Sequence, residues 1–126
     1  MLAKHRELEL SSLMTDSCLF CRIASGAIPV SLIAENEYAV AFRDIAPKAP
    51  VHVLVIPRRH IASLSDADDS AELGQIASLA AEVARQEGLS EAGYRVVTNT
   101  GPDGGQSVPH LHFHVLGGRA MGWPPG

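Results

Sequence analysis

The sequence predicts an α+β domain in which a mostly antiparallel sheet of about five strands packs against one long helix, with a short helix before it. The order of the elements predicts this class: strand-like runs come first, one amphipathic segment follows, and further strand-like runs end the chain. The 126 residues suit one compact domain. We expect an N-terminal extension at 1–17 and a single domain at 18–126, which includes a C-terminal tail at 117–126.

A short helix and three strands are expected in the first half of the domain. The helix covers 18–24, with Ser17 as its cap and Gly26 after its end. Asn36-Glu37 is expected to join two strands as a hairpin, and the two prolines of 44–50 make that segment a loop. The strand-like runs are short and bounded by turn residues, and they fall at 30–35, 38–43 and 51–56.

One long helix and two strands are expected in the second half. Ser65 and the acidic residues that follow it indicate a helix start, and Gly88 indicates its end. Between them, apolar residues recur at spacings of three and four, at Leu73, Ile76, Ala80 and Val83. A glycine-rich loop at 100–105 separates strand-like runs at 94–99 and 110–116.

Composition excludes several classes of partner. The formal net charge of −4 does not suit a long nucleic acid, because proteins that bind one are usually basic. No apolar run approaches the roughly 18 to 20 residues that cross a bilayer, and the polar N-terminus does not resemble a signal peptide, so we expect a cytoplasmic protein. In that compartment Cys18 and Cys21 are expected to be metal ligands or reduced thiols rather than a structural disulfide.

Three histidines alternate with apolar residues near the C-terminus. In a strand, His110, His112 and His114 share one face. A single histidine in a strand is usually structural, but three in this pattern bring three groups that titrate near neutral pH onto one surface. The pattern therefore favours a functional site.

Two functions are open to this triplet. A single metal ion bound by all three is disfavoured, because His110 and His114 lie about 13 Å apart along an extended strand. The alternative is nucleophilic catalysis, in which the middle imidazole attacks and its neighbours orient it and stabilise charge. The loop just upstream, at 99–107, can supply backbone N–H groups to a phosphate, although glycine loops of this kind are often plain turns.

The segment from Gly104 to Leu116 resembles the signature of the histidine-triad family, His-φ-His-φ-His-φ-φ with φ apolar. The resemblance extends over nearly all of 18–126, including 44–52 and 55–60. The tail at 117–126 is similar to that of the Hint branch, the purine nucleoside phosphoramidases. These motifs together are highly specific, and they imply the fold described above.

The resemblance also implies roles for the residues of the site. His112 would be the nucleophile that forms a nucleotidyl-histidine intermediate, and Ser107 would help to protonate the leaving amine. His110 and His52 would support the triad. The phosphate oxygens would be bound by the triad and the glycine loop, through His114, Gly105, Gln106 and Ser107. No cofactor is needed for this cycle.

The nucleotide would be a purine nucleotide of the AMP or GMP type. By resemblance, Asp44 and Asn99 would contact the ribose, whereas Phe20, Ile23 and Ile45 would surround the purine. From pattern alone, those three apolar residues would be ordinary core, and only the resemblance assigns them to the purine. The family also implies a homodimer in which Trp123 reaches toward the partner's site, although Trp123 could instead anchor the tail on its own subunit.

The cysteine pair completes a second pattern. By resemblance to some bacterial-type members of the family, Cys18, Cys21, His60 and His110 would form a Cys2His2 site for structural zinc. The alternative is two reduced thiols that bind no metal. Three other functions compete with phosphoramidate hydrolysis: hydrolysis of dinucleoside polyphosphates, nucleotide binding by a scaffold whose hydrolysis is incidental, and zinc-dependent hydrolysis at the triad.

Overall fold

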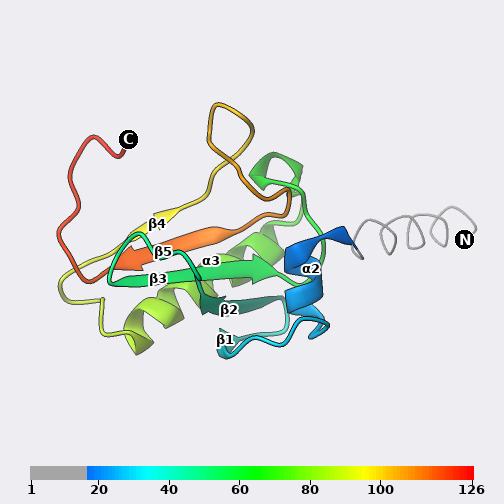
Figure 1. Ribbon diagram of the computed structural model, residues 1–126, viewed down its shortest axis with the longest axis horizontal. Coiled ribbons are helices and arrows are strands. Elements are labelled where there is room, and N and C mark those ends of the chain that lie inside the picture. Colours follow the sequence, from blue (N-terminus) through cyan, green and yellow to red (C-terminus); the bar gives the residue numbers. More distant parts are fainter. Residues whose placement is uncertain (1–16) are drawn as a thin grey trace, which may run out of the picture.

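A five-stranded antiparallel sheet in the order β1-β2-β3-β5-β4 organises the computed structural model, which describes residues 17–126. The long helix α3 lies along one face of this sheet, and α2 lies where β3 ends (Figure 1). The predicted extension at 1–17 lies almost wholly outside the described residues. The elements are α2 (Leu19–Ala24), β1 (Leu32–Glu35), β2 (Ala39–Arg43), β3 (Val51–Pro57), a 3-10 turn (Leu64–Asp66), α3 (Ser70–Gln86), β4 (Arg95–Val97) and β5 (Phe113–Gly117).

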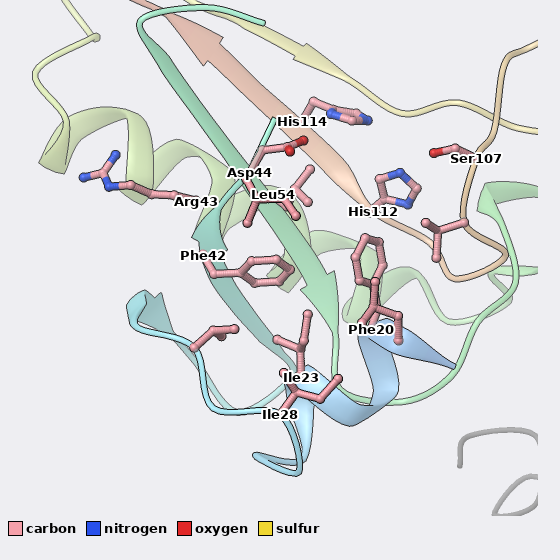
Figure 2. Close-up of a pocket in the computed structure, with 14 residues that line it drawn as sticks. Phe20, Ile23, Ile28, Phe42, Arg43, Asp44, Leu54, Ser107, His112 and His114 are labelled. Carbon is pink, nitrogen blue, oxygen red and sulfur yellow. The ribbon is translucent and has the colours of Figure 1, made fainter. Parts of the chain in front are cut away.

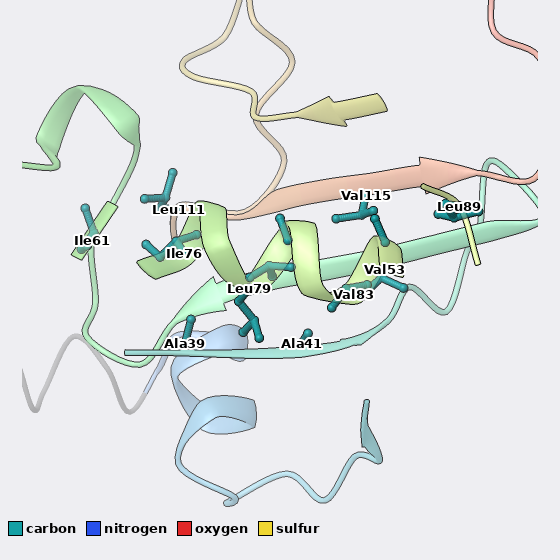
Figure 3. Close-up of a cluster of buried hydrophobic side chains, with 13 residues drawn as sticks. Ala39, Ala41, Val53, Ile61, Ile76, Leu79, Val83, Leu89, Leu111 and Val115 are labelled. Atoms are coloured by element: carbon teal, nitrogen blue, oxygen red, sulfur yellow. The ribbon is translucent and has the colours of Figure 1, made fainter. Parts of the chain in front are cut away.

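The sheet is buried on both faces, because alternate residues of its central strands enter different clusters. Ala39 and Ala41 of β2 face α3, whereas Val40 and Phe42 face the other side. Figure 3 shows the cluster beneath α3, in which Leu79 of the helix is fully buried against the sheet. The predicted helix stripe is confirmed, and Leu79 and Ala84 are additional members that the predicted spacing did not include. None of the helices in 17–126 is long and apolar enough to span a membrane.

The caps and turns differ in detail from the prediction. The N-cap of α2 is Cys18 rather than Ser17, because the Cys18 sulfur accepts from the backbone N–H of Cys21 at 3.4 Å. Asp69 caps α3 by accepting from two backbone N–H groups of its first turn. In the β1–β2 hairpin, Asn36 Oδ1 accepts from the backbone N–H groups of Tyr38 and Ala39, so the link extends to Tyr38.

The last two strands are shorter than predicted. β5 begins at Phe113, because the backbone before it pairs with the loop after β3: Leu111 N donates to Ile61 O at 2.6 Å. β4 ends at Val97, and beyond it Thr98 bonds through its side chain to the backbone oxygen of His112. The predicted alternation nevertheless persists, since Leu111 belongs to the cluster under α3 while His112 faces the opposite side.

Candidate active site

A cavity of about 380 Å³ opens on the face of the sheet opposite α3. Figure 2 shows the apolar side chains of Phe42, Ile23 and Ile28 on one side and the polar groups of Asp44, Ser107, His112 and His114 together on the other. The predicted residues Phe20, Ile23, Asp44, Ile45, Ser107, His112 and His114 all line it, together with Leu19, Ile28, Val30, Phe42, Arg43, Leu54 and Val108. The cavity therefore combines a hydrophobic compartment with an imidazole cluster, which suits a ligand with one apolar and one polar end.

Phe20 joins the hydrophobic compartment to the imidazoles. Its ring meets Phe42 and His112 edge to face, with centroids 5.9 and 5.1 Å away. Phe20 and Ile23 belong to the buried cluster as well as to the cavity wall, so they are core residues that also line the cavity. Ile45 is different, because it is fully exposed at the rim and is not core.

The hydrogen bonds determine which nitrogen of His112 carries its proton. The ring nitrogen Nδ1 lies 2.7 Å from the backbone oxygen of His110, which can only accept. Nδ1 therefore carries the proton in the neutral ring, and the lone pair is on Nε2. The side chain is buried to 3% exposure, so this orientation is held by its surroundings. His112 therefore has its free lone pair on Nε2.

A chain of hydrogen bonds gives His114 the opposite role. The backbone N–H of Lys48 donates to His52 Nδ1 at 3.0 Å, so the proton of neutral His52 is on Nε2. That Nε2 lies 2.9 Å from His114 Nδ1, which must accept, and the proton of His114 is therefore on its own Nε2. His114 therefore has an N–H donor on Nε2, whereas His112 has a lone pair on Nε2. Asp44, His52 and His114 could bring three ligand atoms together, but the proton on His52 Nε2 disfavours a metal there.

Burial keeps these supporting imidazoles neutral. Desolvation, reinforced by His112 and His52, lowers the pKa of His114 to about 4. Desolvation also lowers the pKa of His52, against the opposing attraction of Asp44, whose carboxylate oxygen lies 3.4 Å away. At neutral pH both rings are therefore uncharged, and the tautomers assigned above are the forms present.

Side-chain hydrogen bonds hold the shape of the glycine loop. The side-chain amide of Gln106 donates to the backbone oxygens of Ala62 and Val108 and accepts from Gly101 N–H. Asn99 donates to the backbone oxygen of Gly104 at 2.7 Å and lies outside the cavity lining. A Cβ on Gly104 would collide with the backbone of Thr100, so this turn requires glycine. The loop thus presents Ser107 at the cavity, while Gly105, Gln106 and Asn99 hold its shape.

Ser107 and His114 face the same space from opposite sides, with His112 between them (Figure 2). A tetrahedral phosphorus group placed there would meet a nucleophile, a donor and a hydroxyl. Trp123 does not reach this site within its own chain, since it is 84% exposed and absent from the cavity lining. It is therefore not a buried anchor on its own subunit.

The cysteines meet two histidines beside the triad. Cys18 Sγ lies 3.3 Å from His110 Nδ1, and Cys21 Sγ lies 3.2 Å from His60 Nδ1 and 3.4 Å from His110 Nδ1. His110 is fully buried, and its Nε2 donates to the backbone oxygen of Pro57 at 3.0 Å, which leaves Nδ1 as a lone pair facing the sulfurs. Burial lowers the pKa of His110 to about 4 and raises that of Cys21 to about 12. The predicted four residues therefore converge.

The sequence reasoning missed several contributors to the site. Phe42 and Leu54 line the cavity, and their alternation with buried neighbours in the strands could have placed them on this face. The backbone N–H of Lys48 and the backbone oxygen of Pro57 select histidine tautomers. No residue type signals such a role, because every residue except proline carries the same donor and acceptor.

The comparisons with known proteins agree with this arrangement. A model of the HIT domain family matches residues 25–121. The crystal structure of a HIT family hydrolase from Legionella pneumophila Philadelphia 1 is 52% identical, with a TM-score of 0.84, and the match covers 87% of this chain and all of that one.

Two further relatives are named for their ligands or reactions. The adenylylsulfatase HINT1 of Arabidopsis thaliana is 44% identical over 131 residues, covering 100% of this chain and 88% of the relative. The crystal structure of a histidine triad nucleotide-binding protein from Candida albicans is 34% identical, with a TM-score of 0.75 and coverage of 86% and 83%. The chain belongs to the HIT family, in its Hint-like branch.

Proposed function

We propose that this protein hydrolyses purine nucleoside phosphoramidates, of the adenosine 5′-monophosphoramidate or aminoacyl-adenylate type, through a nucleotidyl-histidine intermediate on His112. The similarity to named HIT hydrolases supports a nucleotide hydrolase in general. The observation that carries the finer proposal is the pair of opposite tautomers, with a lone pair on His112 Nε2 and a proton on His114 Nε2.

The reaction proceeds in two displacements at phosphorus. His112 Nε2 attacks, and a bond to phosphorus forms as the phosphorus–nitrogen bond of the substrate breaks. The leaving nitrogen takes the proton of the Ser107 hydroxyl and departs as an amine, because an unprotonated amide ion is a poor leaving group. Water then attacks phosphorus, releases His112 and returns a proton to Ser107. The product is the nucleoside monophosphate.

The remaining groups bind and orient. His114 Nε2–H donates to a phosphate oxygen and stabilises the charge that develops there. Phe20, Phe42 and Leu54 enclose the purine in an apolar compartment, and Asp44 at the rim is available to a ribose hydroxyl. The Gln106 amide is already hydrogen-bonded to backbone groups of Gly101, Ala62 and Val108. The loop therefore contributes to phosphate binding through Ser107 and its backbone.

Mass spectrometry of the protein mixed with an adenosine phosphoramidate tests this proposal. We expect a transient adduct of AMP on His112, trapped by acid quenching and located by peptide mapping. Parallel rates on adenylyl sulfate and a diadenosine polyphosphate would define the leaving group, and faster turnover of either would reassign the substrate. Undiminished turnover with no adduct at any quench time would contradict the histidine intermediate.

A homodimer would complete the site. β4 is an edge strand of three residues; its Val96 is 43% exposed, and Tyr94, just before the strand, is 40% exposed. Trp123 is 84% exposed. In Figure 1 the C-terminal tail, in red, runs away from the sheet at the end opposite α2. We expect a dimer in sedimentation analysis, and a Trp123→Ala variant with normal dimerisation but a changed KM for substrates with large leaving groups.

The four-residue cluster is proposed to hold structural zinc. Two sulfurs and two imidazole nitrogens are the donors of a common zinc site, and bond lengths of about 2.3 Å to sulfur and about 2.0–2.1 Å to nitrogen place tetrahedral ligands about 3.5 Å apart. The three sulfur–nitrogen distances of 3.2 to 3.4 Å fit that requirement, and all four ligand atoms of Cys18, Cys21, His60 and His110 lie within 4.8 Å of one another. The Pro57 oxygen orients His110 from behind, as ligand histidines require. Zinc would fasten α2 to the sheet.

Elemental analysis distinguishes this site from a catalytic metal. We expect one zinc per chain, and none in a Cys18→Ser/Cys21→Ser variant. Metal-free protein that is still folded should hydrolyse substrate, because no step above uses a metal. Abolition of activity by a chelator, with the fold intact, would support the zinc-dependent alternative instead.

A further inference from the structure

The first residues of the C-terminal tail pack against the loop at 44–50, which joins β2 to β3. β5 ends beside the start of β3, since Gly117 pairs with Val51, and the tail therefore leaves the sheet next to this loop (Figure 1). Gly118 turns the chain there with a φ of +90°, and a Cβ at this position would lie 2.8 Å from Pro50 Cβ. Only glycine allows so close an approach in this conformation.

The side chain of Arg119 ties the tail to the same loop. Its Nη2 donates to the backbone oxygen of Lys48 at 3.1 Å, and its Nη1 donates to the backbone oxygen of Ala120 at 3.3 Å. Among residues 17–126, no carboxylate forms an ion pair with Arg119. The guanidinium therefore acts on the backbone, and it joins two segments that are 71 positions apart in sequence.

Lys48 is the point at which the loop meets the histidines. Its backbone N–H donates to His52 Nδ1 at 3.0 Å, and His52 Nε2 lies 2.9 Å from His114 Nδ1. The loop at 44–50 belongs to no helix or strand, so no ladder of backbone hydrogen bonds fixes its peptide groups. Arg119 holds the peptide unit that follows Lys48, and His52 engages the unit that precedes it. The direction of the Lys48 N–H depends on both contacts.

We propose that Arg119 is a positioning residue for catalysis: by holding the Lys48 carbonyl it aims the Lys48 N–H at His52 and so determines where His114 carries its proton. A neutral imidazole has two tautomers, and the partner at one nitrogen selects between them. Without Arg119 the Lys48 peptide can turn, and His52 loses the donor at Nδ1. Asp44 Oδ2, 3.4 Å from His52 Nε2, favours the same tautomer, so the loss should mix the tautomers rather than invert them.

Nuclear magnetic resonance of full-length protein with ¹⁵N-labelled histidine tests this proposal, because long-range ¹H–¹⁵N correlations distinguish protonated from unprotonated ring nitrogens. In Arg119→Ala we expect His52 and His114 to show both tautomers, where the wild type shows one. The tautomer of His112 should stay unchanged, since the His110 oxygen selects it independently. Arg119 is exposed, so circular dichroism should also stay unchanged.

The kinetic arm rests on the proposed function, in which His114 Nε2–H donates to a phosphate oxygen. For an adenosine phosphoramidate, kcat of Arg119→Ala should fall about threefold to tenfold, the range expected for one hydrogen bond, with a smaller change in KM. Arg119→Lys keeps a cationic donor and should recover part of kcat.

Arg95→Ala is the matched control. It removes the same charge and also loosens the tail, because Arg95 donates to the backbone oxygen of Gly122 at 2.6 Å, but this contact does not reach Lys48. Its histidine tautomers should be those of the wild type. Single tautomers in Arg119→Ala, mixed tautomers in Arg95→Ala, or mixed tautomers with an unchanged kcat would each overturn the proposal. A wild type that leaves phosphoramidates intact would refute the proposed function instead, and the tautomers would still be measurable.

Discussion

Both faces of the sheet are buried, but they differ in composition and in how closely they are packed. The face under α3 is closed by apolar residues such as Val53, Val55 and Leu79, all with no exposed surface. The opposite face combines a smaller apolar cluster with buried or half-buried imidazoles, among them His52, His112 and His114, and a cavity of about 380 Å³. A close-packed face stabilises the fold, and an imperfectly filled face with ordered polar groups can bind and react.

The buried ring nitrogens of the histidines on the polar face all have hydrogen-bond partners. Among residues 17–126, no buried side-chain nitrogen or oxygen lacks a hydrogen-bond partner. Backbone atoms of Lys48, Pro57 and His110 supply partners that each engage one ring nitrogen. An unsatisfied buried polar group costs about 1–3 kcal/mol, so these contacts let the face keep reactive imidazoles at little cost in stability. Substitutions on the two faces should therefore separate activity from stability.

The largest expected effect is on the polar face. His112→Asn removes Nε2 as a nucleophile, and we expect kcat/KM for an adenosine phosphoramidate to fall by at least about a thousandfold. Urea unfolding should show little loss of stability, because asparagine can still donate to the His110 oxygen. A variant that retains wild-type turnover would assign the attack to another group.

On the apolar face, Leu79→Ala should destabilise the fold without touching the chemistry. The cavity left beneath α3 should lower the free energy of unfolding by about 3 kcal/mol, measured by urea denaturation. The exposed Glu82→Ala on the same helix should change it by less than about 0.5 kcal/mol. If the folded Leu79→Ala protein had a strongly altered kcat, the two faces would be coupled rather than separate.

The relay behind the triad gives a smaller effect. His52→Leu removes the donor to His114 Nδ1, so the tautomer of His114 is no longer held, and we expect kcat to fall about tenfold to hundredfold with a smaller change in KM. His52→Gln can still donate from its amide nitrogen and should recover most of the activity. Equal losses in the two variants would mean that His52 only fills space.

The smallest effect is a pH dependence of stability. Since the pKa of His114 is lowered from 6.5 to about 4, the folded state favours the neutral ring. Its contribution to stability is complete above pH 6.5, declines as pH falls below this value, and is lost by about pH 4. The loss should be about 1 kcal/mol after allowance for partial solvent exposure. His114→Asn lacks this contribution, so its unfolding free energy should converge with that of the wild type as pH falls; parallel curves would argue against a buried neutral His114.

Local pattern was enough to predict several parts of this protein. The period-two alternation separated Leu111 from His112, and the three-and-four spacing located α3, because side-chain direction follows directly from backbone geometry. The motif around His110, His112 and His114 indicated the family, which the comparisons confirm. These features depend on residues that are close in sequence.

Other parts were decided by tertiary structure alone. Cys18 meets His110 across 92 positions of sequence, and His52 meets His114 across 62. The tautomers of His112 and His52 depend on the backbone atoms of His110 and Lys48, which have the same chemistry in any residue. The sequence by itself therefore determined which side chains could react. Packing decided which nitrogen of each ring has the lone pair and which has the proton, because only the folded chain brings those backbone partners within hydrogen-bond distance.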